Sequence, residues 1–316
     1  MYDIKLVKRN TEMKTHNLKQ ATTVFLFTFL YGCIATSQRS DTATSSPYTI
    51  GYTSLPSGII EIYEGTAEGT STITSTQENG GYVAWSPNGK KIAFYGKYDD
   101  KKTWSIRTMH IDGTNRKRLT HAKNKWDNAP DWSPDGKSIV FAREYKNSEG
   151  FWYPEIWIMN ADGSEQRQIT SLRGSNPIFT PDGRIVFSWE FEDKTSAISI
   201  VDIDGKNVIR LTHHSAQEWH PEVSPDGSQI AFMSDRDGNF EIYVMDIDGS
   251  NQKRLTNNNV DDWYPSWSPD GSHLIFSAAT GEKREDRTIY MMHANGSSIR
   301  PIIKGGAQAA WLKTVK

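Results

Sequence analysis

The sequence has little cysteine and no excess of charge of either sign. Its one cysteine is Cys33, so no disulfide can form within the chain. The 36 lysines and arginines are balanced by 38 aspartates and glutamates, which leaves a formal net charge of −2. Because proteins that bind nucleic acid usually carry a basic excess, this balance argues against a nucleic-acid partner.

Short motifs of catalysis are also missing. The sequence contains no G-x-S-x-G, no H-E-x-x-H and no glycine-rich phosphate loop, and no cysteine follows Cys33 that could act as a nucleophile. We therefore predict a protein that is not an enzyme and that has no resident cofactor.

No apolar run near the N-terminus is long enough to cross a membrane. The stretch Ala21–Leu30 is shorter than the ~20 residues that a membrane-spanning helix needs. It follows Lys14 and Lys19 and leads into Leu30-Tyr31-Gly32-Cys33, as in an export signal. It resembles a bacterial lipoprotein signal peptide, in which the cysteine is acylated and becomes the mature N-terminus, although Tyr31 replaces the usual small residue.

This resemblance predicts three parts of the chain. Residues 1–33 are expected to be a lipoprotein-type signal peptide, with Met13 as an alternative start and Cys33 as the lipidated residue. Residues 34–47 are small and polar, and we expect a flexible tether because they offer too little apolar surface to fold. Residues 48–316 form the folded domain. An ordinary cleaved signal with a coincidental cysteine is the alternative to lipidation.

What the sequence has in quantity is a repeated block ending in Pro-Asp-Gly or Pro-Asn-Gly. The block recurs at intervals of about 45 residues, each time followed by a short strand pattern such as Ile-x-Phe. Its copies are Trp85–Gly89, Trp132–Gly136, Phe179–Gly183, Val223–Gly227 and Trp267–Gly271. A fixed period of this size in strand-forming sequence predicts a propeller or solenoid, whose units bury their apolar faces only against one another.

One repeat shows the elements of a propeller blade. The turn Ser224–Gly227 is followed by strand-forming residues at 230–232, 241–245 and 253–256, with the Asp-Gly turn Asp246–Gly249 before the last of them. Together with the strand that precedes the first turn, these make four antiparallel strands. Each repeat is therefore expected to form one four-stranded blade.

The two ends of the repeat region predict six blades. Residues 48–54 and 61–63 match the second and third strands of a unit, but no first strand precedes them. The missing strand is found at the other end, where Ala310–Leu312 lies one interval after Trp267. We therefore predict an all-β, six-bladed propeller whose first blade is completed by the C-terminal strand, which removes exposed sheet edges.

The repeats resemble those of the TolB-type six-bladed propeller. The stretches WSPDGKSIVF, SDRDGNFEIYVMDIDGSNQKRLT and WYPSWSPDGSHLIF carry this likeness, which extends from Tyr48 to the C-terminus. The resemblance implies a bacterial envelope location and protein binding at one mouth of the propeller. TolB itself has an α/β domain before its propeller, whereas a tether and a lipid anchor are expected here. Prolyl-oligopeptidase-like enzymes and some polysaccharide lyases share the propeller, so fold alone does not fix function.

Strand order predicts which face of the propeller binds. The second-to-third loops and the blade connections share one face and vary in sequence, as binding loops do. Just before each inner strand on this face stand aromatic, acidic and amide residues. The expected binding residues are Tyr82, Asp127, Asn128, Asn176, Glu218, Trp219, His220, Asp262, Trp263 and Tyr264. In the closing strand the same place is held by Ala307-Gln308.

Several of these residues also have structural interpretations. Trp219 and Trp263 could be wedged between blades rather than exposed. The stretch Glu144–Tyr153 is expected to be a longer loop that ends in three aromatics, of which Phe151 and Tyr153 fit the start of a strand and Trp152 is left open. The Asp-Gly motifs are expected to be turns and not calcium loops, because the closing glutamate is missing.

Metal binding is not predicted, although two groups of residues are candidate ligands. His213, His214 and His220 lie close in sequence but lack the spacing of a ligand set. The alternative to a metal-free channel is a single cation held by Asp127 or Asp262.

We therefore expect a monomeric, non-catalytic scaffold. It would be lipid-anchored on the periplasmic side of the outer membrane and bind an envelope or peptidoglycan-associated protein. The alternative is a carbohydrate-binding or metal-dependent lyase-like propeller that uses the same face, with Glu218 and His220 as ligand or base.

Overall fold

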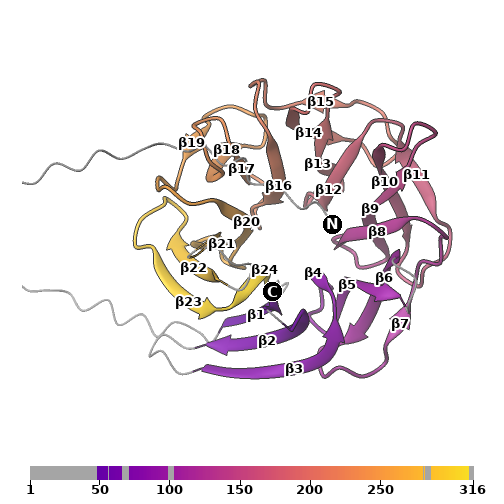
Figure 1. The fold of residues 1–316 in the computed structure, drawn as a ribbon, viewed down its shortest axis with the longest axis horizontal. Helices are drawn as coiled ribbons and strands as arrows, with labels where there is room; N and C mark the ends of the chain where they lie inside the picture. The colour runs from indigo at the N-terminus through magenta and orange to yellow at the C-terminus, as the bar shows by residue number, and fades with distance from the viewer. Residues whose placement is uncertain are drawn as a thin grey trace, which may run out of the picture. The chain divides into compact units, whose positions relative to one another are not determined.

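The computed structural model describes residues 48–55, 57–65, 71–98, 103–279, 281 and 286–312. The expected signal peptide with Cys33 and the expected tether lie outside these residues. Six four-stranded antiparallel sheets stand around a central channel (Figure 1). This confirms the predicted six-bladed propeller. Within the described ranges, no helix is long and apolar enough to cross a bilayer.

The first three blades are formed in the order that the repeat predicts. The first blade consists of β24 (Gly306–Trp311), β1 (Tyr48–Ser54), β2 (Ile59–Gly65) and β3 (Ser71–Asn79). The second consists of β4 (Gly81–Trp85), β5 (Lys91–Tyr98), β6 (Thr103–His110) and β7 (Lys117–Arg118). The third consists of β8 (Trp126–Trp132), β9 (Ser138–Lys146), β10 (Trp152–Asn160) and β11 (Arg167–Thr170).

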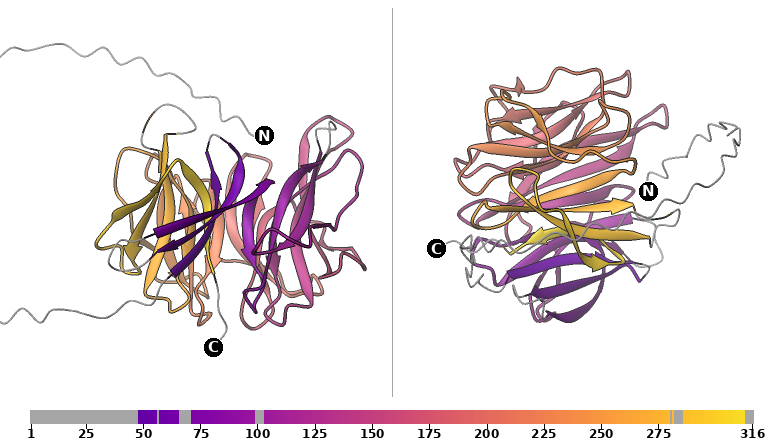
Figure 2. Two further views of the ribbon diagram at one scale, coloured as in Figure 1. Left: turned by 90° about the horizontal axis from the view of Figure 1, so that it is seen from below. Right: turned by 90° about the vertical axis from the view of Figure 1, so that its left-hand side faces the viewer.

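The other three blades repeat this arrangement. The fourth contains β12 (Gly174–Phe179), β13 (Ile185–Glu190), β14 (Ser196–Val201) and β15 (Ile209–Arg210). The fifth contains β16 (Glu218–Val223), β17 (Gln229–Ser234), β18 (Glu241–Asp246) and β19 (Lys253–Arg254). The sixth contains β20 (Asp262–Trp267), β21 (His273–Ala279), β22 (Arg287–His293) and β23 (Arg300–Lys304). Figure 2 shows the ring of blades from two sides.

The C-terminal strand closes the ring. β24 pairs antiparallel with β1, placing Ile50 opposite Trp311 and Ser54 opposite Gly306. Past the end of the strand, the backbone N–H of Leu312 donates to the carbonyl of Thr49 at 2.9 Å. The predicted closure of the first blade by the C-terminal segment is therefore confirmed.

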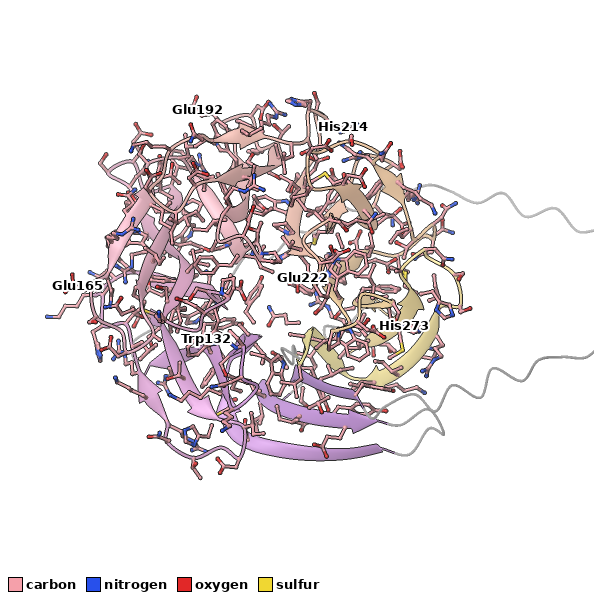
Figure 3. The ribbon with its side chains drawn as sticks, turned by 180° about the vertical axis from the view of Figure 1, so that it is seen from behind. Trp132, Glu165, Glu192, His214, Glu222 and His273 are labelled. Atoms are coloured by element: carbon pink, nitrogen blue, oxygen red, sulfur yellow. The ribbon has the colours of Figure 1, made fainter. Side chains whose placement is uncertain are left out.

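The hydrophobic core lies between the blades. Six apolar clusters each combine residues from two neighbouring sheets. Five blades place a phenylalanine of the second strand, at most 2% exposed, in the core: Phe94, Phe141, Phe187, Phe232 and Phe276. Side chains fill the space between sheets, while Glu165, Glu192 and His214 lie toward the circumference (Figure 3). No blade can bury this face alone, which explains the strict sequence period.

The Asp-Gly motifs form turns stabilised by their own side chains. In the third blade, Ser133 Oγ donates to Asp135 Oδ1 at 2.7 Å, and Gly136 has a φ of 69°. In the fifth blade, Asp248 Oδ1 accepts the backbone N–H of Ser250 at 2.9 Å, and Gly249 has a φ of 87°. These carboxylates bond within the turn, as predicted, rather than form a calcium loop.

The long loop expected in the third blade is shorter than predicted. β9 continues to Lys146 and β10 begins at Trp152, which leaves Asn147–Phe151 as the connection. Asn147 Oδ1 accepts the backbone N–H groups of Glu149 and Phe151, which tightens the turn. Trp152 and Tyr153 therefore belong to a strand, and Phe151 at the tip is 66% exposed.

Candidate functional site

Every inner strand carries a β-bulge. The register with the neighbouring strand shifts within each of the six inner strands or opposite it. One residue at each bulge has a positive φ, between 45° and 57°. These six bulge residues are Tyr82, Ala129, Asn176, His220, Tyr264 and Gln308. A bulge bends the strand and re-aims a side chain, so it gives every blade the same inward position.

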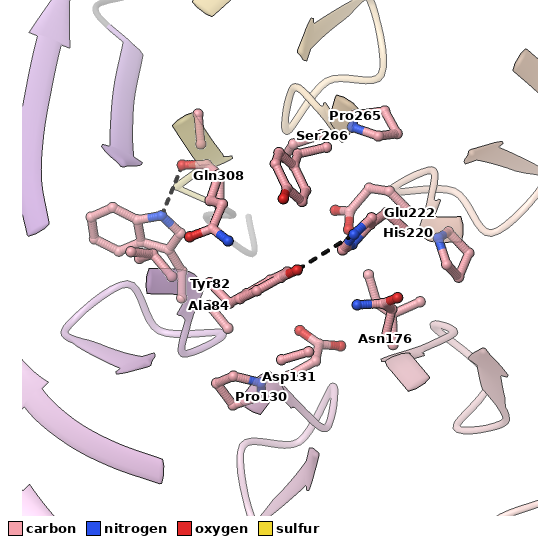
Figure 4. A pocket seen from close by; sticks show the side chains of 18 of the residues that line it. Tyr82, Ala84, Pro130, Asp131, Asn176, His220, Glu222, Pro265, Ser266 and Gln308 are labelled. Atoms are coloured by element: carbon pink, nitrogen blue, oxygen red, sulfur yellow. Dashed lines mark hydrogen bonds between the residues drawn. The ribbon is translucent and has the colours of Figure 1, made fainter. Parts of the chain in front are cut away.

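The six bulge residues line one cavity in the channel (Figure 4). Its volume is about 110 Å³. Since a cavity of roughly 10–15 Å³ is enough for one water molecule, this cavity has room for several waters or one side chain, but not for a large ligand. Asp131 and Glu222, two residues further along their strands, also line it. Glu222 lies beside the channel in Figure 3.

Three bulge residues form an aromatic cluster in this cavity. The ring of His220 lies 4.5 Å from Tyr264 and 5.5 Å from Tyr82, centroid to centroid. The Tyr82 hydroxyl is 3.4 Å from His220 Nε2. Burial lowers the pKa of His220 to about 3, so this imidazole is neutral at physiological pH. The cluster therefore offers aromatic rings and neutral hydrogen-bonding groups to whatever enters the channel.

The structure brings together four of the residues that we expected to bind: Tyr82, Asn176, His220 and Tyr264. They lie within the inner strands, not before them as expected. Sequence reasoning missed Asp131 and Glu222. The repeat contained a signal for both, because each immediately precedes the repeated strand-end position occupied by Trp132 or Val223.

The two expected binding residues of the third blade are buried in polar pairs instead. Asp127, 1% exposed, accepts hydrogen bonds from Arg143 Nε at 2.6 Å and Nη2 at 2.9 Å. Asn128, 7% exposed, donates to Glu144 at 2.7 Å. Both carboxylate oxygens of Asp127 are occupied by the guanidinium, so this residue does not hold a channel cation in this state.

The two other expected acids are fully buried between strands. Glu218 accepts a hydrogen bond from Arg236, and its Oε1 is 3.6 Å from His214 Nδ1. Asp262 Oδ2 accepts from Asn258 at 2.8 Å. Neither lines the channel cavity. Their hydrogen-bond partners come from adjacent strands and loops. These carboxylates therefore stabilise the ends of the blades and are not exposed to a ligand in the channel.

Trp219 and Trp263 follow their structural interpretation. Both pack against the apolar cluster between the fifth and sixth blades. The Arg287 guanidinium lies 4.4 Å from the Trp263 ring, which is a cation–π distance. Neither tryptophan reaches the channel cavity.

The three histidines considered as candidate metal ligands, His213, His214 and His220, do not converge on one point. His214 lies in the connection between the fourth and fifth blades, beside Glu218, whereas His220 lines the channel cavity. Across the residues that the structure describes, no group of three histidine, cysteine, aspartate or glutamate side chains could hold a metal ion.

Asp262 and Glu241 form a buried acid pair. Both side chains are 0% exposed, and neither Asp262 Oδ1 nor Glu241 Oε2 accepts a hydrogen bond. We infer that the two carboxyl groups share one proton. Burial, and the negative charge of Glu241, raise the pKa of Asp262 to about 7. Burial likewise raises the pKa of Glu190 to about 7.

We expect Asp262 to make a contribution to stability that falls as the pH rises toward its raised pKa of about 7. Between the ordinary pKa of Asp262 and its raised folded value, the folded state binds more protons than the unfolded state, so the free energy of unfolding decreases with pH. Because His220, whose pKa burial lowers to about 3, changes stability with pH in the opposite direction, the measurement compares wild type with Asp262→Asn. In urea unfolding, wild type should lose about 2 kcal/mol more than Asp262→Asn between about pH 5 and about pH 8. Asp262→Asn should flatten this dependence, and Glu190→Gln should remove part of the remainder. An unchanged pH profile in Asp262→Asn would refute the shared proton.

The comparisons with known proteins agree with this architecture. A model of the TolB beta propeller domain matches residues 147–313, more than half of the chain. The chain superposes on TolB from Acinetobacter baumannii with a TM-score of 0.69 and 22% identity, covering 85% of this chain and 67% of that one. For a putative TolB from Agrobacterium tumefaciens the TM-score is 0.64 and the identity 23%, covering 84% and 92%. None of the curated proteins compared with the chain matches it.

The fold and the family model define a six-bladed β-propeller of the TolB type. The chain belongs to the TolB β-propeller domain family. A more distant likeness, to an oligogalacturonate lyase in complex with manganese, has a TM-score of 0.51 at 15% identity and covers 81% of this chain and 72% of that one. At this identity the likeness concerns the fold alone.

Proposed function

We propose that this propeller is a non-catalytic module that binds a segment of another protein at the channel mouth lined by the bulge residues. The single observation that carries the proposal is the set of six positive-φ residues at one equivalent position. An L-residue in the left-handed region is less stable than glycine by about 1 kcal/mol. Yet five of the six positions hold a side chain larger than alanine, and all six face the same cavity.

The size of the cavity supports insertion of a side chain rather than enclosure of a whole small molecule. At about 110 Å³, it suits one anchoring group of a larger partner. Aromatic rings such as those of Tyr82 and Tyr264 supply contact area at low cost in conformational entropy, as at protein interfaces. The rest of the partner would then lie across the face that holds the blade connections.

The binding assay compares two variants that differ in which face they alter. Tyr82→Ala plus Tyr264→Ala should lower recovery of the partner from an envelope extract by about tenfold or more, because both anchoring rings are lost. The control is Ile111→Ala plus Ile203→Ala, which removes two exposed apolar side chains from turns at the opposite face. Equal recovery by both variants would exclude the channel mouth as the binding site.

We further propose that the module is held in the bacterial envelope by lipid on Cys33, at the periplasmic face of the outer membrane. The sequence Leu30-Tyr31-Gly32-Cys33 after an apolar run supports this placement. The mass of the mature N-terminal peptide should include a diacylglyceryl group on Cys33. Cleavage without that added mass would leave a protein that is exported but not anchored.

The lyase alternative finds no specific support in the geometry. Glu218, which it would use as ligand or base, is bonded to Arg236, while His220 faces the channel between two tyrosines. The two side chains therefore contact different groups and do not form one reaction centre.

A further inference from the structure

A row of aromatic rings lies on the face that carries the blade connections. It runs from Tyr95, near the end of β5, through Trp104 and Trp126 to Trp152, which stand at or near the starts of β6, β8 and β10. Successive centroids are 4.5, 5.2 and 4.2 Å apart, with interplanar angles of 15°, 20° and 38°. All four side chains are half-buried. The row therefore bridges the second and third blades and stays in contact with solvent.

The faces of these rings are already occupied. Trp104 stacks between Tyr95 and Trp126, and Trp126 lies between Trp104 and Trp152. Over Trp152 lies the ammonium group of Lys146, at 5.5 Å from the ring centroid. What remains for a ligand is the edges of the rings, which carry the positive end of the aromatic quadrupole.

Hydrogen-bond donors and positive charge add to this edge. Among the hydrogen bonds of the described residues, none uses the indole N–H of Trp104, Trp126 or Trp152. Lys146 borders one end of the row, and Lys125 is the chain neighbour of Trp126, with its ammonium group 4.8 Å from the Tyr145 ring. Ring edges, three indole donors and two ammonium groups together favour a ligand that is rich in acceptors and negatively charged.

We propose that the row Tyr95–Trp104–Trp126–Trp152, with Lys125 and Lys146, is a second binding site, which takes an extended acidic segment of a partner polypeptide. This site lies outside the channel cavity, and its Tyr95 ring is 5.6 Å, centroid to centroid, from the bulge residue Tyr82. An extended chain advances about 3.3 Å per residue, so about five residues would span the row. Backbone carbonyls would accept from the indole N–H groups, and acidic side chains would pair with the two lysines.

A polysaccharide fits this arrangement less well than a polypeptide. Sugars bind aromatic residues by stacking their apolar C–H faces on open ring faces. Here Trp104 and Trp126 each have a neighbouring ring on both sides, and Lys146 lies over Trp152. The geometry leaves edges and donors, which match carbonyl and carboxylate oxygens.

The test measures binding of a synthetic oligoglutamate of about ten residues to the full chain by calorimetry and tryptophan fluorescence. Wild type should bind it saturably, and binding should weaken with added salt. Lys125→Glu plus Lys146→Glu should weaken binding by about tenfold or more. The matched control is Lys90→Glu plus Lys137→Glu, which makes the same charge change at the opposite face, in turns of the second and third blades that the row bridges. It should bind like wild type.

A second pair of variants separates the donors from the rings. Trp104→Phe plus Trp126→Phe keeps an aromatic stack and removes two indole N–H groups, and should weaken oligoglutamate binding several-fold. The proposal is overturned if wild type does not bind oligoglutamate, or if both lysine pairs prove equivalent. Tighter binding of oligogalacturonate than of oligoglutamate would replace the polypeptide by an acidic sugar chain.

Discussion

A chain that ends at Gly305, and so lacks β24, is expected to lose the cooperative unfolding transition of the full-length protein. The truncation removes the inner strand of the first blade and the buried side chains of Ala307, Ala309 and Trp311. It also exposes an edge of β1 and opens the core between the first and sixth blades. The loss should exceed the roughly 5 kcal/mol that keeps a small domain folded, and the open edge should promote aggregation.

Urea titration followed by tryptophan fluorescence, together with size-exclusion chromatography, measures both effects. A chain that ends at Leu312 is the control, because it keeps the β24 pairing and the Leu312 hydrogen bond. If the chain ending at Gly305 stays monomeric with an unchanged midpoint, ring closure is not what holds this propeller together.

Arg143→Met is expected to destabilise the protein by about 3–5 kcal/mol, because it leaves the Asp127 carboxylate buried without its partner. The two side chains are 6% and 1% exposed, and two hydrogen bonds join them. Arg143 also lies 4.5 Å from the Trp157 ring, so packing is lost with the charge. Equilibrium unfolding in urea measures the change.

Two further variants show that burial is the cause. Arg184→Met removes a comparable pair with Asp182, whose side chains are 38% and 58% exposed, and should cost less than about 1 kcal/mol. Adding Asp127→Asn to Arg143→Met should restore part of the lost stability, since the unpaired charge is then removed. A similar cost for the Arg143 and Arg184 variants would contradict this account.

The fold was predictable because each repeat carries, within its own sequence, the turns and strands of one blade. The spacing of the Pro-Asp-Gly turns fixed the blade period, and the displaced strand at Ala310–Leu312 indicated how the ring closes. These are local patterns that need no knowledge of neighbours. The face formed by the blade connections followed from strand order alone.

The site was only half predictable because it depends on register and on partners distant in sequence. Asp127 does not line the channel cavity because Arg143, sixteen residues away, donates a hydrogen bond to its carboxylate within the blade. The bulge shifts the alternation by one residue, so Tyr82 and His220 turn inward where simple alternation would not place them. The stacking of Trp104 on Trp126 joins two blades, and no short sequence pattern predicts this contact.

The bulges give the protein one interchangeable position per blade. The backbone at each is set by the register shift, not by the side chain that it carries, and alanine, asparagine, glutamine, histidine and tyrosine all occur there. Point mutations at six codons would therefore change the lining proposed to bind a partner while the interblade clusters stay intact. A combinatorial library at these codons would sample new specificities on an unchanged scaffold, with glycine variants gaining thermal stability as they lose affinity.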